Sequence, residues 1–392
     1  MQNFEWNIPT VIEFGKGAIE KLSAMAESGS KALLVYGGGS IKRTGIYDDV
    51  MKVMNENGIT VFELSGVEPN PRIQTVRKGV DLCKAEGIDM VLAVGGGSSI
   101  DCAKVVAAGA CYDGDAWDLV LDASKITKCL PVYTVLTMSA TGSEMNKNAV
   151  ISDLTKNEKW GTHSPLFKPR MSILDPTYTF SVPKKHTAAG TADIMSHTFE
   201  NYFNFEDAAL QKTFAEGILK TCIKYGPIAI EEPDNYEARA NLMWASTNAI
   251  NGLIGLGSSC GWSVHPIEHE LSAFYDITHG EGLAILTPAW MEAIMKKDPR
   301  TITNIAVYGQ NVWNLTGNMD TEEGRLTIAQ RAVEKTREFF VNSLGIPGSL
   351  HEVGIEDEEH FEKMAEKASA QLGGAFVPLS KDEVVEIYRA VK

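Results

Sequence analysis

The chain has 392 residues and a formal net charge of −15, with 36 Lys and Arg residues against 51 Asp and Glu residues. This length predicts two or three domains, and a composition of 44% hydrophobic and 22% charged residues is typical of a soluble globular protein, which excludes disorder and fibrous repeats. The acidic charge is spread along the chain. It argues against nucleic acid as a partner, because binding a polyanion requires clustered Lys and Arg.

The N-terminal segment from Met1 to Trp6 has neither a basic nor an apolar stretch, so no secretory signal is visible and we expect a cytoplasmic protein. Residues 240–267 contain no Asp, Glu, Lys or Arg. Asparagines, serines and glycines interrupt this stretch, so we expect a buried helical segment and no membrane span. The six cysteines include no CxxC pair, which predicts reduced, mostly buried thiols.

The first 180 residues alternate short apolar, β-branched runs with stretches of helical character. The runs expected to be strands are 33–36, 60–62, 90–94, 132–137, 149–152 and 172–174. Strands separated by helices, with glycine turns after the strands, predict a parallel α/β sheet. The ligand crevice of such a sheet lies at the carboxyl ends of its strands.

Beyond Pro183 the β-branched runs disappear, and long amphipathic stretches follow at 207–225, 325–344 and 357–372. The sequence therefore predicts an α/β fold in two parts. An N-terminal Rossmann-like parallel-sheet domain, residues 1–180, is followed by an all-α domain, residues 181–392.

Two identical glycine-rich loops each follow an expected strand and precede a helix. They are Gly37-Gly38-Gly39-Ser40 and Gly95-Gly96-Gly97-Ser98. Glycine lets the backbone approach a phosphate, and a helix N-terminus offers free amides. The spacing differs from GxGxxG, and a tight turn is the alternative for either loop alone. Their matching positions favour a nucleotide site.

A third turn, residues 137–144, follows the apolar run that ends at Leu136 and is rich in small hydroxyl side chains. Thr137, Thr141 and Ser143 lie in it. Hydroxyls without bulk suit ribose or phosphate oxygens, although ordinary Ser/Thr turns have the same composition.

Asp193 and His197 are four residues apart in a helix-compatible stretch, which places carboxylate and imidazole on one face. His265, His269 and His279 then cluster in a chain with only eight histidines. One carboxylate with two or three imidazoles suits Fe²⁺ or Zn²⁺ and is too rich in nitrogen for Mg²⁺ or Ca²⁺. Histidines that only form hydrogen bonds in a core are the alternative.

The segment around the later histidines has its own helix signals. Pro266 suits a first helical turn, so we expect His265 at the start of a helix. Gly280 and Gly282 suggest a bend beside His279.

These residues resemble the iron-containing, or group III, alcohol dehydrogenases. That family's first signature is matched by Ser172-Ile173-Leu174-Asp175, Pro183, Ala188, Gly190, Asp193, Ile194, His197 and Glu200. The second is matched by His265-Pro266-Ile267-Glu268-His269-Glu270-Leu271 and His279-Gly280. Because Phe4, Pro9-Thr10 and Phe14-Gly15 resemble the family's opening, the resemblance covers essentially the whole chain.

The resemblance implies that Asp193, His197, His265 and His279 bind the metal, with His269 nearby but off the metal. It also implies that a nicotinamide cofactor contacts Gly95, Gly96, Gly97, Ser98, Asp101, Lys104, Thr137, Thr141, Ser143 and Lys159. The turn Ser139-Ala140-Thr141-Gly142 differs from the commoner Ala-Gly-Thr-Gly. Together with the loop after Tyr36, it points to the butanol dehydrogenase and broad aldehyde reductase branch.

The implied activity is that of a metal-dependent NAD(P)(H) alcohol dehydrogenase that interconverts primary alcohols such as butanol and their aldehydes by hydride transfer, as a homodimer. The donor set suits Fe²⁺ or Zn²⁺, with Co²⁺, Ni²⁺ or Mn²⁺ as further candidates. We expect His269 to protonate the nascent alkoxide, directly or through water. A hydrogen bond that orients a metal ligand is the alternative role for His269.

The loop at 37–43 bears on the choice of cofactor. It contains no acid that would bind the adenosine 2′-hydroxyl of NAD(H) and repel a 2′-phosphate. Ser40, Lys42 and Arg43 can receive that phosphate instead, so we expect NADP(H) to be preferred over NAD(H).

Two other functions are compatible with parts of this pattern. The first is that of the dehydroquinate-synthase-like carbon–oxygen lyases, which have a similar fold and also use a nicotinamide cofactor and a metal. A non-catalytic redox sensor that binds metal and nucleotide is the second.

Overall fold

The computed structural model describes residues 1–258 and 261–392 and divides the chain into two compact units. We call residues 7–182 and 232–251 the sheet unit, and residues 1–6, 183–231 and 252–392 the helical unit. The division after Val182 lies close to the expected boundary, but the units are not contiguous. Residues 232–251 group with the sheet because Thr247 donates a hydrogen bond to the Glu144 carboxylate at 2.6 Å and Trp244 packs edge-on against Phe14.

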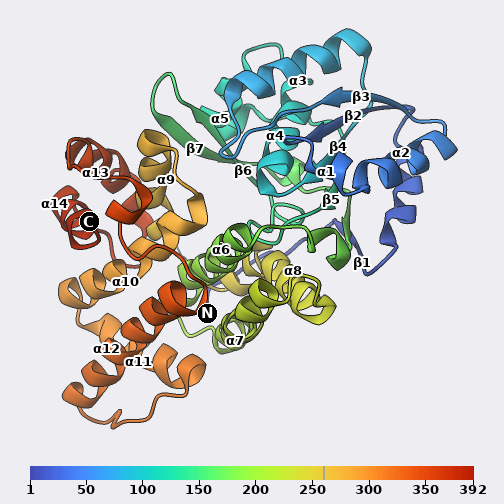
Figure 1. Ribbon diagram of the computed structural model, residues 1–392. Helices are drawn as coiled ribbons and strands as arrows, with labels where there is room; N and C mark the ends of the chain where they lie inside the picture. The colour runs from blue at the N-terminus through green and yellow to red at the C-terminus, as the bar shows by residue number, and fades with distance from the viewer. Residues whose placement is uncertain (259–260) are drawn as a thin grey trace. The chain divides into compact units, whose positions relative to one another are not determined.

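A six-stranded, fully parallel sheet forms the centre of the sheet unit (Figure 1). Its strands lie in the order β1 (Val11–Phe14), β8 (Met171–Leu174), β5 (Val132–Leu136), β4 (Met90–Gly95), β2 (Lys31–Tyr36) and β3 (Thr60–Leu64). The expected parallel sheet is therefore confirmed. The expected strand at 149–152 forms β6 (Asn148–Asp153), which pairs antiparallel with β7 (Glu158–His163) outside this sheet.

Both faces of the sheet are buried, because successive side chains of a strand point to opposite faces. Leu33 and Val35 of β2 join one core, whereas Leu34 and Tyr36 join the other. The first core lies under α3 (Ile73–Glu86), α4 (Gly97–Gly109) and α5 (Ala116–Leu121). The second lies under the 3₁₀-helix η1 (Ala18–Glu27), α1 (Ser40–Arg43) and α2 (Ile46–Glu56). Helix α8 (Tyr236–Ile250) packs against η4 (Pro176–Thr179).

The helical unit confirms the expected all-α character of the C-terminal region. Its main helices are α6 (Lys184–Tyr202), α7 (Ala209–Glu231), α9 (Val264–Tyr275), α10 (His279–Lys297), α11 (Arg300–Trp313), α12 (Glu322–Glu338), α13 (Phe361–Ser369) and α14 (Lys381–Ala390). A π-helical turn, Phe339–Ser343, continues α12. Helix α10 packs against both α6 and α9, and this contact positions the imidazoles described below.

The uncharged stretch at 240–267 does not form one helix. Helix α8 ends at Ile250, a 3₁₀ turn covers Leu253–Gly255, and α9 begins at Val264. Within the described part of the chain, no helix is both long and apolar enough to cross a bilayer.

The cysteines in the described residues are free thiols. Cys83, Cys102 and Cys222 are buried, Cys129 is half-buried and Cys111 is exposed. Cys260 lies outside the described residues.

Candidate functional site

Helix α6 presents Asp193, His197 and Glu200 from one buried face, since these residues are spaced at i, i+4 and i+7. The helix runs through the interior of its unit, and Asp193 and His197 are 3% and 5% exposed. The predicted helical pairing of Asp193 and His197 is confirmed.

Helices α9 and α10 add two more imidazoles to this face. The Nε2 atoms of His197, His265 and His279 lie 3.4, 3.7 and 3.9 Å from the Oδ1 atom of Asp193. The rings of His197 and His265 are stacked, with centroids 4.7 Å apart. The edge of Trp262 packs against His265 at 4.5 Å between ring centroids and forms an apolar wall beside the cluster.

The donor atoms in this cluster fit a cation. Asp193 Oδ1 and His265 Nε2 are buried and form no hydrogen bond of normal geometry with any described residue. Donors about 2 Å from one tetrahedral ion lie roughly 3.3 Å from each other. The donor atoms of Asp193, His197 and His265 lie within 4.8 Å of one another, and Nε2 of His279 lies 3.9 Å from the same Asp193 oxygen. Three imidazole nitrogens and a carboxylate oxygen have the chemistry of a site for Fe²⁺ or Zn²⁺.

The electrostatics of the cluster match its geometry. Burial opposes ionisation of Asp193, but the neighbouring imidazoles, His197 first, lower its pKa to about 2. Burial likewise opposes protonation of His265, but the Asp193 and Glu200 carboxylates outweigh it and raise the pKa of His265 to about 9. The carboxylate field that raises this pKa would equally attract a divalent cation.

Two carboxylates behind the imidazoles were not assigned a role from the sequence. Glu200 lies 3.0 Å from Nδ1 of His265, and Glu268 contacts Nδ1 of His279. Both glutamates are buried. Each stands three residues after a site histidine, His197 and His265, and this i, i+3 spacing is the signal that could have found them.

Gly280 and Gly282 do not form the expected bend, and this expectation is wrong. Both glycines lie inside α10, and the chain turns before it at Asp276, which has a positive φ of 52°. A Cβ atom on Gly280 would lie 2.1 Å from the Ala189 carbonyl oxygen of α6, and one on Gly282 would lie 2.9 Å from Cγ of Glu268. The glycines therefore let α10 approach α6 and the Glu268 side chain closely.

His269 lies one turn after His265 on α9 and is half-buried. Its ring centroid lies 6.3 Å from that of His265 and 5.7 Å from that of His279. One donor atom of His269 lies within 4.8 Å of donor atoms from Glu268 and His279. The structure thus places His269 beside the four-residue cluster, as expected.

In the sheet unit, the two glycine-rich loops flank the point where the strand order reverses. From β2 the chain goes to β3 on one side of β2, and then to β4 on the other side. The segment Gly37–Ser40 follows β2, and the segment Gly95–Ser98 begins at the last residue of β4. This is the position at which open α/β sheets bind their ligands.

The hydroxyl-rich turn after β5 lies next to the second glycine loop. The Thr137 amide donates to the Gly95 carbonyl at 3.0 Å. A Cβ atom on Gly97 would lie 2.3 Å from Oγ1 of Thr141, so only glycine allows this approach. Three of the predicted cofactor-binding segments are therefore adjacent.

Asp101, Lys104 and Ser143 bind one another behind the loops. The Ser143 hydroxyl donates to Asp101 at 2.5 Å and lies 2.8 Å from the Lys104 ammonium, which also contacts both oxygens of Asn146 and the Asn148 carbonyl. Lys104 is fully buried, and burial lowers its pKa to about 8. This network supports the loop, whereas Lys159, also predicted to bind the cofactor, lies buried on β7.

The loop that follows β2 carries two cations in different surroundings. The Lys42 ammonium lies 3.0 Å from the Glu63 carboxylate, which also accepts hydrogen bonds from Tyr36 and Tyr47. Arg43 is exposed and forms no ion pair with any residue that the structure describes. Glu63 was not predicted to lie beside this loop, because it is on the neighbouring strand β3.

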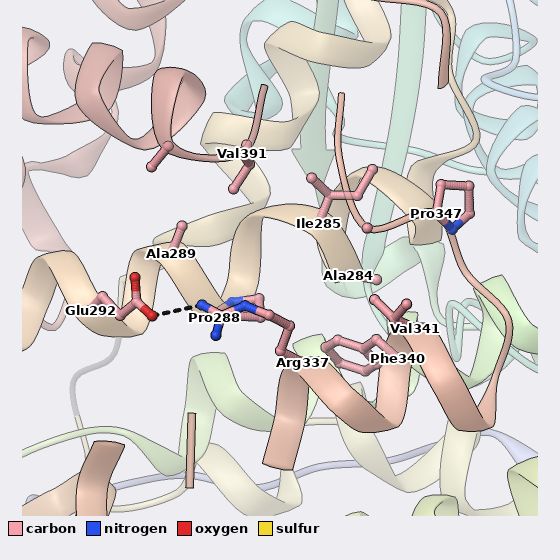
Figure 2. Close-up of a pocket in the computed structure, with 12 residues that line it drawn as sticks. Ala284, Ile285, Pro288, Ala289, Glu292, Arg337, Phe340, Val341, Pro347 and Val391 are labelled. Carbon is pink, nitrogen blue, oxygen red and sulfur yellow. Dashed lines mark hydrogen bonds and ion pairs between the residues drawn. The ribbon is translucent and has the colours of Figure 1, made fainter. Parts of the chain in front are cut away.

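A separate pocket in the helical unit contains none of the predicted site residues (Figure 2). Ala284, Ile285 and Pro288 of α10 and Phe340 of the π-helical turn form its apolar wall. Figure 2 shows Arg337 directed at Glu292, to which it donates at 2.6 Å. The two charged side chains of this pocket, Arg337 and Glu292, are already paired with each other. The imidazole cluster therefore remains the candidate site.

Comparison with known proteins covers both halves of the chain. Residues 9–176 match the family model described as iron-containing alcohol dehydrogenase, and residues 187–392 match the Fe-containing alcohol dehydrogenase family, C-terminal model. The NADH-dependent butanol dehydrogenase A of Clostridium acetobutylicum is 56% identical over 99% of both chains. The NADPH-dependent aldehyde reductase YqhD of Escherichia coli is 40% identical over 95% of both chains.

A solved structure agrees with these matches. The NADH-dependent butanol dehydrogenase A of Thermotoga maritima superposes with a TM-score of 0.93 at 39% identity, and the match covers 100% of this chain and 99% of that one. Because the family models span nearly the whole sequence and the relatives share its full length, the chain belongs to the iron-containing alcohol dehydrogenase family.

Proposed function

We propose that the protein is a metal-dependent, NAD(P)(H)-dependent alcohol dehydrogenase that interconverts primary alcohols such as butanol and their aldehydes. The observation that carries the proposal is the buried cluster of Asp193, His197, His265 and His279, in which Asp193 Oδ1 and His265 Nε2 form no hydrogen bond of normal geometry with any described residue. Burying such atoms without a hydrogen bond is unfavourable. A cation bound by the four side chains would supply the missing interaction.

The roles of the chain's own residues follow from their positions. The four side chains would hold the cation, which would supply Lewis acidity toward a carbonyl oxygen. The Trp262 ring packs against one side of His265. His269, which lies beside His265 and His279, would pass a proton to or from the alcohol oxygen. The loops after β2, β4 and β5 would hold the nicotinamide cofactor, which supplies the hydride.

The finer cofactor assignment is a preference for NADP(H) over NAD(H). Its support is local, since the loop at 37–43 has no acid and the Arg43 guanidinium is exposed without an ion-pair partner among the described residues. Lys42 contributes less than its position in the sequence indicates, because Glu63 already neutralises it. The names of the relatives point both ways, since two butanol dehydrogenases of C. acetobutylicum are named NADH-dependent and YqhD is named NADPH-dependent.

The same proposal covers the metal and the assembly. Fe²⁺ or Zn²⁺ fits three imidazoles and one carboxylate, and Co²⁺, Ni²⁺ and Mn²⁺ are the further candidates to load. We propose a homodimer in the cytoplasm as the working state. Sedimentation of the purified protein tests the dimer directly.

Steady-state oxidation of NADPH by butanal tests the proposed function. Metal-free protein is loaded with each divalent ion in turn, and absorbance of the reduced cofactor is followed with and without butanal. The proposal expects butanal-dependent oxidation with at least one ion. Binding of metal and NADPH with no turnover for any ion would indicate the redox sensor. Conversion of a substrate of the dehydroquinate-synthase-like lyases, without net oxidation of the cofactor, would indicate that class of lyase instead.

A further inference from the structure

Glu200 links helix α6 to the start of helix α9. Its Oε2 atom accepts a hydrogen bond from the Ser263 amide at 2.7 Å, and its Oε1 atom accepts from the amides of Val264 and His265 at 2.8 and 3.0 Å. The Ser263 side chain, at the N-cap position of α9, forms no capping bond among the described residues. Glu200 therefore supplies the cap of α9 from a different helix.

The same Glu200 carboxylate also contacts an imidazole of the cluster. Its Oε1 atom lies 3.0 Å from Nδ1 of His265. A carboxylate has no proton to donate, so the proton of this hydrogen bond is on Nδ1. A cation would therefore bind His265 by displacing the proton of the other ring nitrogen, Nε2, which is the atom that lies 3.7 Å from Asp193.

Glu268 repeats this arrangement between α9 and α10. It lies on α9, is fully buried, and its Oε2 atom contacts Nδ1 of His279 at the first turn of α10. Its Oε1 atom accepts a hydrogen bond from the Ser272 hydroxyl at 2.5 Å, which fixes the carboxylate. His279 accordingly directs Nε2 toward Asp193, at 3.9 Å. Gly282 leaves the space that Glu268 needs.

We propose that Glu200 and Glu268 are positioning residues that hold His265 and His279 in the tautomer protonated at Nδ1, and so preform the cation site and raise its affinity. The proposal rests on the proposed function for the identity of the site. Each carboxylate joins the helix that bears it to the helix that bears the imidazole, α6 to α9 and α9 to α10. Their negative charges also make both imidazoles better donors to a cation.

The test measures Zn²⁺ affinity directly, by competition with a chromophoric chelator at fixed pH. Glu200→Gln and Glu268→Gln keep the size of each side chain and remove its charge. Each variant should bind Zn²⁺ about 10- to 100-fold more weakly than the wild type, which is the usual effect of losing a carboxylate behind a ligand imidazole. Glu270→Gln is the matched control, because Glu270 is a buried carboxylate on the same helix and lies 3.8 Å from Lys367.

A spectroscopic measurement separates positioning from general loosening of the fold. Zn²⁺-loaded protein labelled with ¹⁵N-histidine should show Nδ1–H protons from His265 and His279 that are hydrogen-bonded to the two carboxylates. Glu268→Gln should shift the His279 signal and leave the His265 signal in place, and Glu200→Gln should do the reverse. Because Glu200 also caps α9, Glu200→Gln can unfold the helix start, and Glu268→Gln then decides the outcome alone.

The proposal is overturned if the Zn²⁺ affinity of Glu268→Gln stays within twofold of Glu270→Gln, or if its His279 signal is unchanged. Turnover does not enter either measurement. A wild type that binds Zn²⁺ but reduces no aldehyde with any of the divalent ions would therefore refute the proposed function and leave this inference intact.

Discussion

The Nε2 atom of His265 lies 3.7 Å from the Oδ1 atom of Asp193, and neither atom forms a hydrogen bond of normal geometry with a described residue. Each such buried group costs about 1 to 3 kcal/mol when it has no partner. The imidazoles of His197 and His279 lie at similar distances from the same oxygen. A cation at this position would satisfy all four donors at once.

Replacing Asp193 tests its place in this site. Asp193→Asn keeps the shape of the side chain and removes the only carboxylate of the four donors, so bound metal and nearly all turnover should be lost. Binding of NADPH should persist, because the predicted cofactor loops belong to the sheet unit. Metal content by atomic absorption and cofactor binding by fluorescence check both parts.

Thr198→Val is the matched control, because the Thr198 hydroxyl is buried on the same helix and donates to the Ile194 carbonyl. It should keep its metal. Normal metal content and rate in Asp193→Asn would remove Asp193 from the site.

Gly38→Asp should shift cofactor preference toward NAD(H). A Cβ atom on Gly38 would have no other atom within 4 Å, and its φ is not in the left-handed region, so the substitution fits the loop. A carboxylate there would repel a 2′-phosphate and accept a hydrogen bond from a 2′-hydroxyl. The ratio of kcat/KM for NADPH to that for NADH should fall at least tenfold.

Gly38→Asn, which has the same size without the charge, should leave that ratio nearly unchanged. Comparable kcat/KM values for NADPH and NADH in the wild-type enzyme would show that the proposed NADP(H) preference is wrong.

Much of the sheet could be predicted from the sequence, because β2 and β4 are buried on both faces and therefore read as continuous apolar runs. Strand β1 was not predicted, because it has only four residues and none of them is buried. Strand β7 contains polar residues such as Glu158 and Lys159, which lower its strand signal. The membership of α8 depends on the Glu144–Thr247 contact, which joins residues 103 positions apart.

The part of the candidate site that lies on one helix could be predicted from the spacing of its residues. Asp193 and His197 share a face because they are four residues apart. The bond between Glu200 and His265 joins residues 65 positions apart, and no local pattern encodes it. Gly280 suggested a bend, whereas its actual role is close packing on Ala189, which depends on a different helix.

His269→Ala tests the proton relay. If His269 passes protons to and from the alcohol oxygen, the variant should keep its metal and its NADPH affinity but lose about 10²-fold in kcat, with a changed pH–rate profile. His360→Ala is the control. His360 packs against Phe274, which is on α9 like His269, with 5.1 Å between the ring centroids. Loss of metal in proportion to activity, with an unchanged pH profile in the remaining holoenzyme, would place His269 among the groups that support the metal.

Thiol reactivity should be confined to Cys111 among the described cysteines. Burial raises the pKa of Cys83 and Cys129 to about 12, and that of Cys102 and Cys222 further still. The thiolate is the reactive form, so at pH 8 these groups are almost entirely protonated. Burial also raises the pKa of Cys111, but its exposure leaves it open to reagents.

Iodoacetamide labelling of the native protein, read by peptide mass spectrometry, checks this pattern. The denatured protein, in which every thiol should be labelled, is the reference. Turnover should survive labelling of Cys111, since the proposed chemistry uses no thiol. Activity lost in step with that labelling would contradict the account.

The stoichiometry of metal activation tests the central claim most directly. Metal-free protein, prepared and kept without oxygen, is titrated with Fe²⁺ and separately with Zn²⁺, while butanal-dependent oxidation of NADPH is measured after each addition. The account predicts that the rate with an activating ion rises linearly and reaches its plateau at one ion per chain, and that Asp193→Asn shows no such rise. Full turnover by the metal-free wild type, or a plateau that Asp193→Asn also reaches, would contradict it.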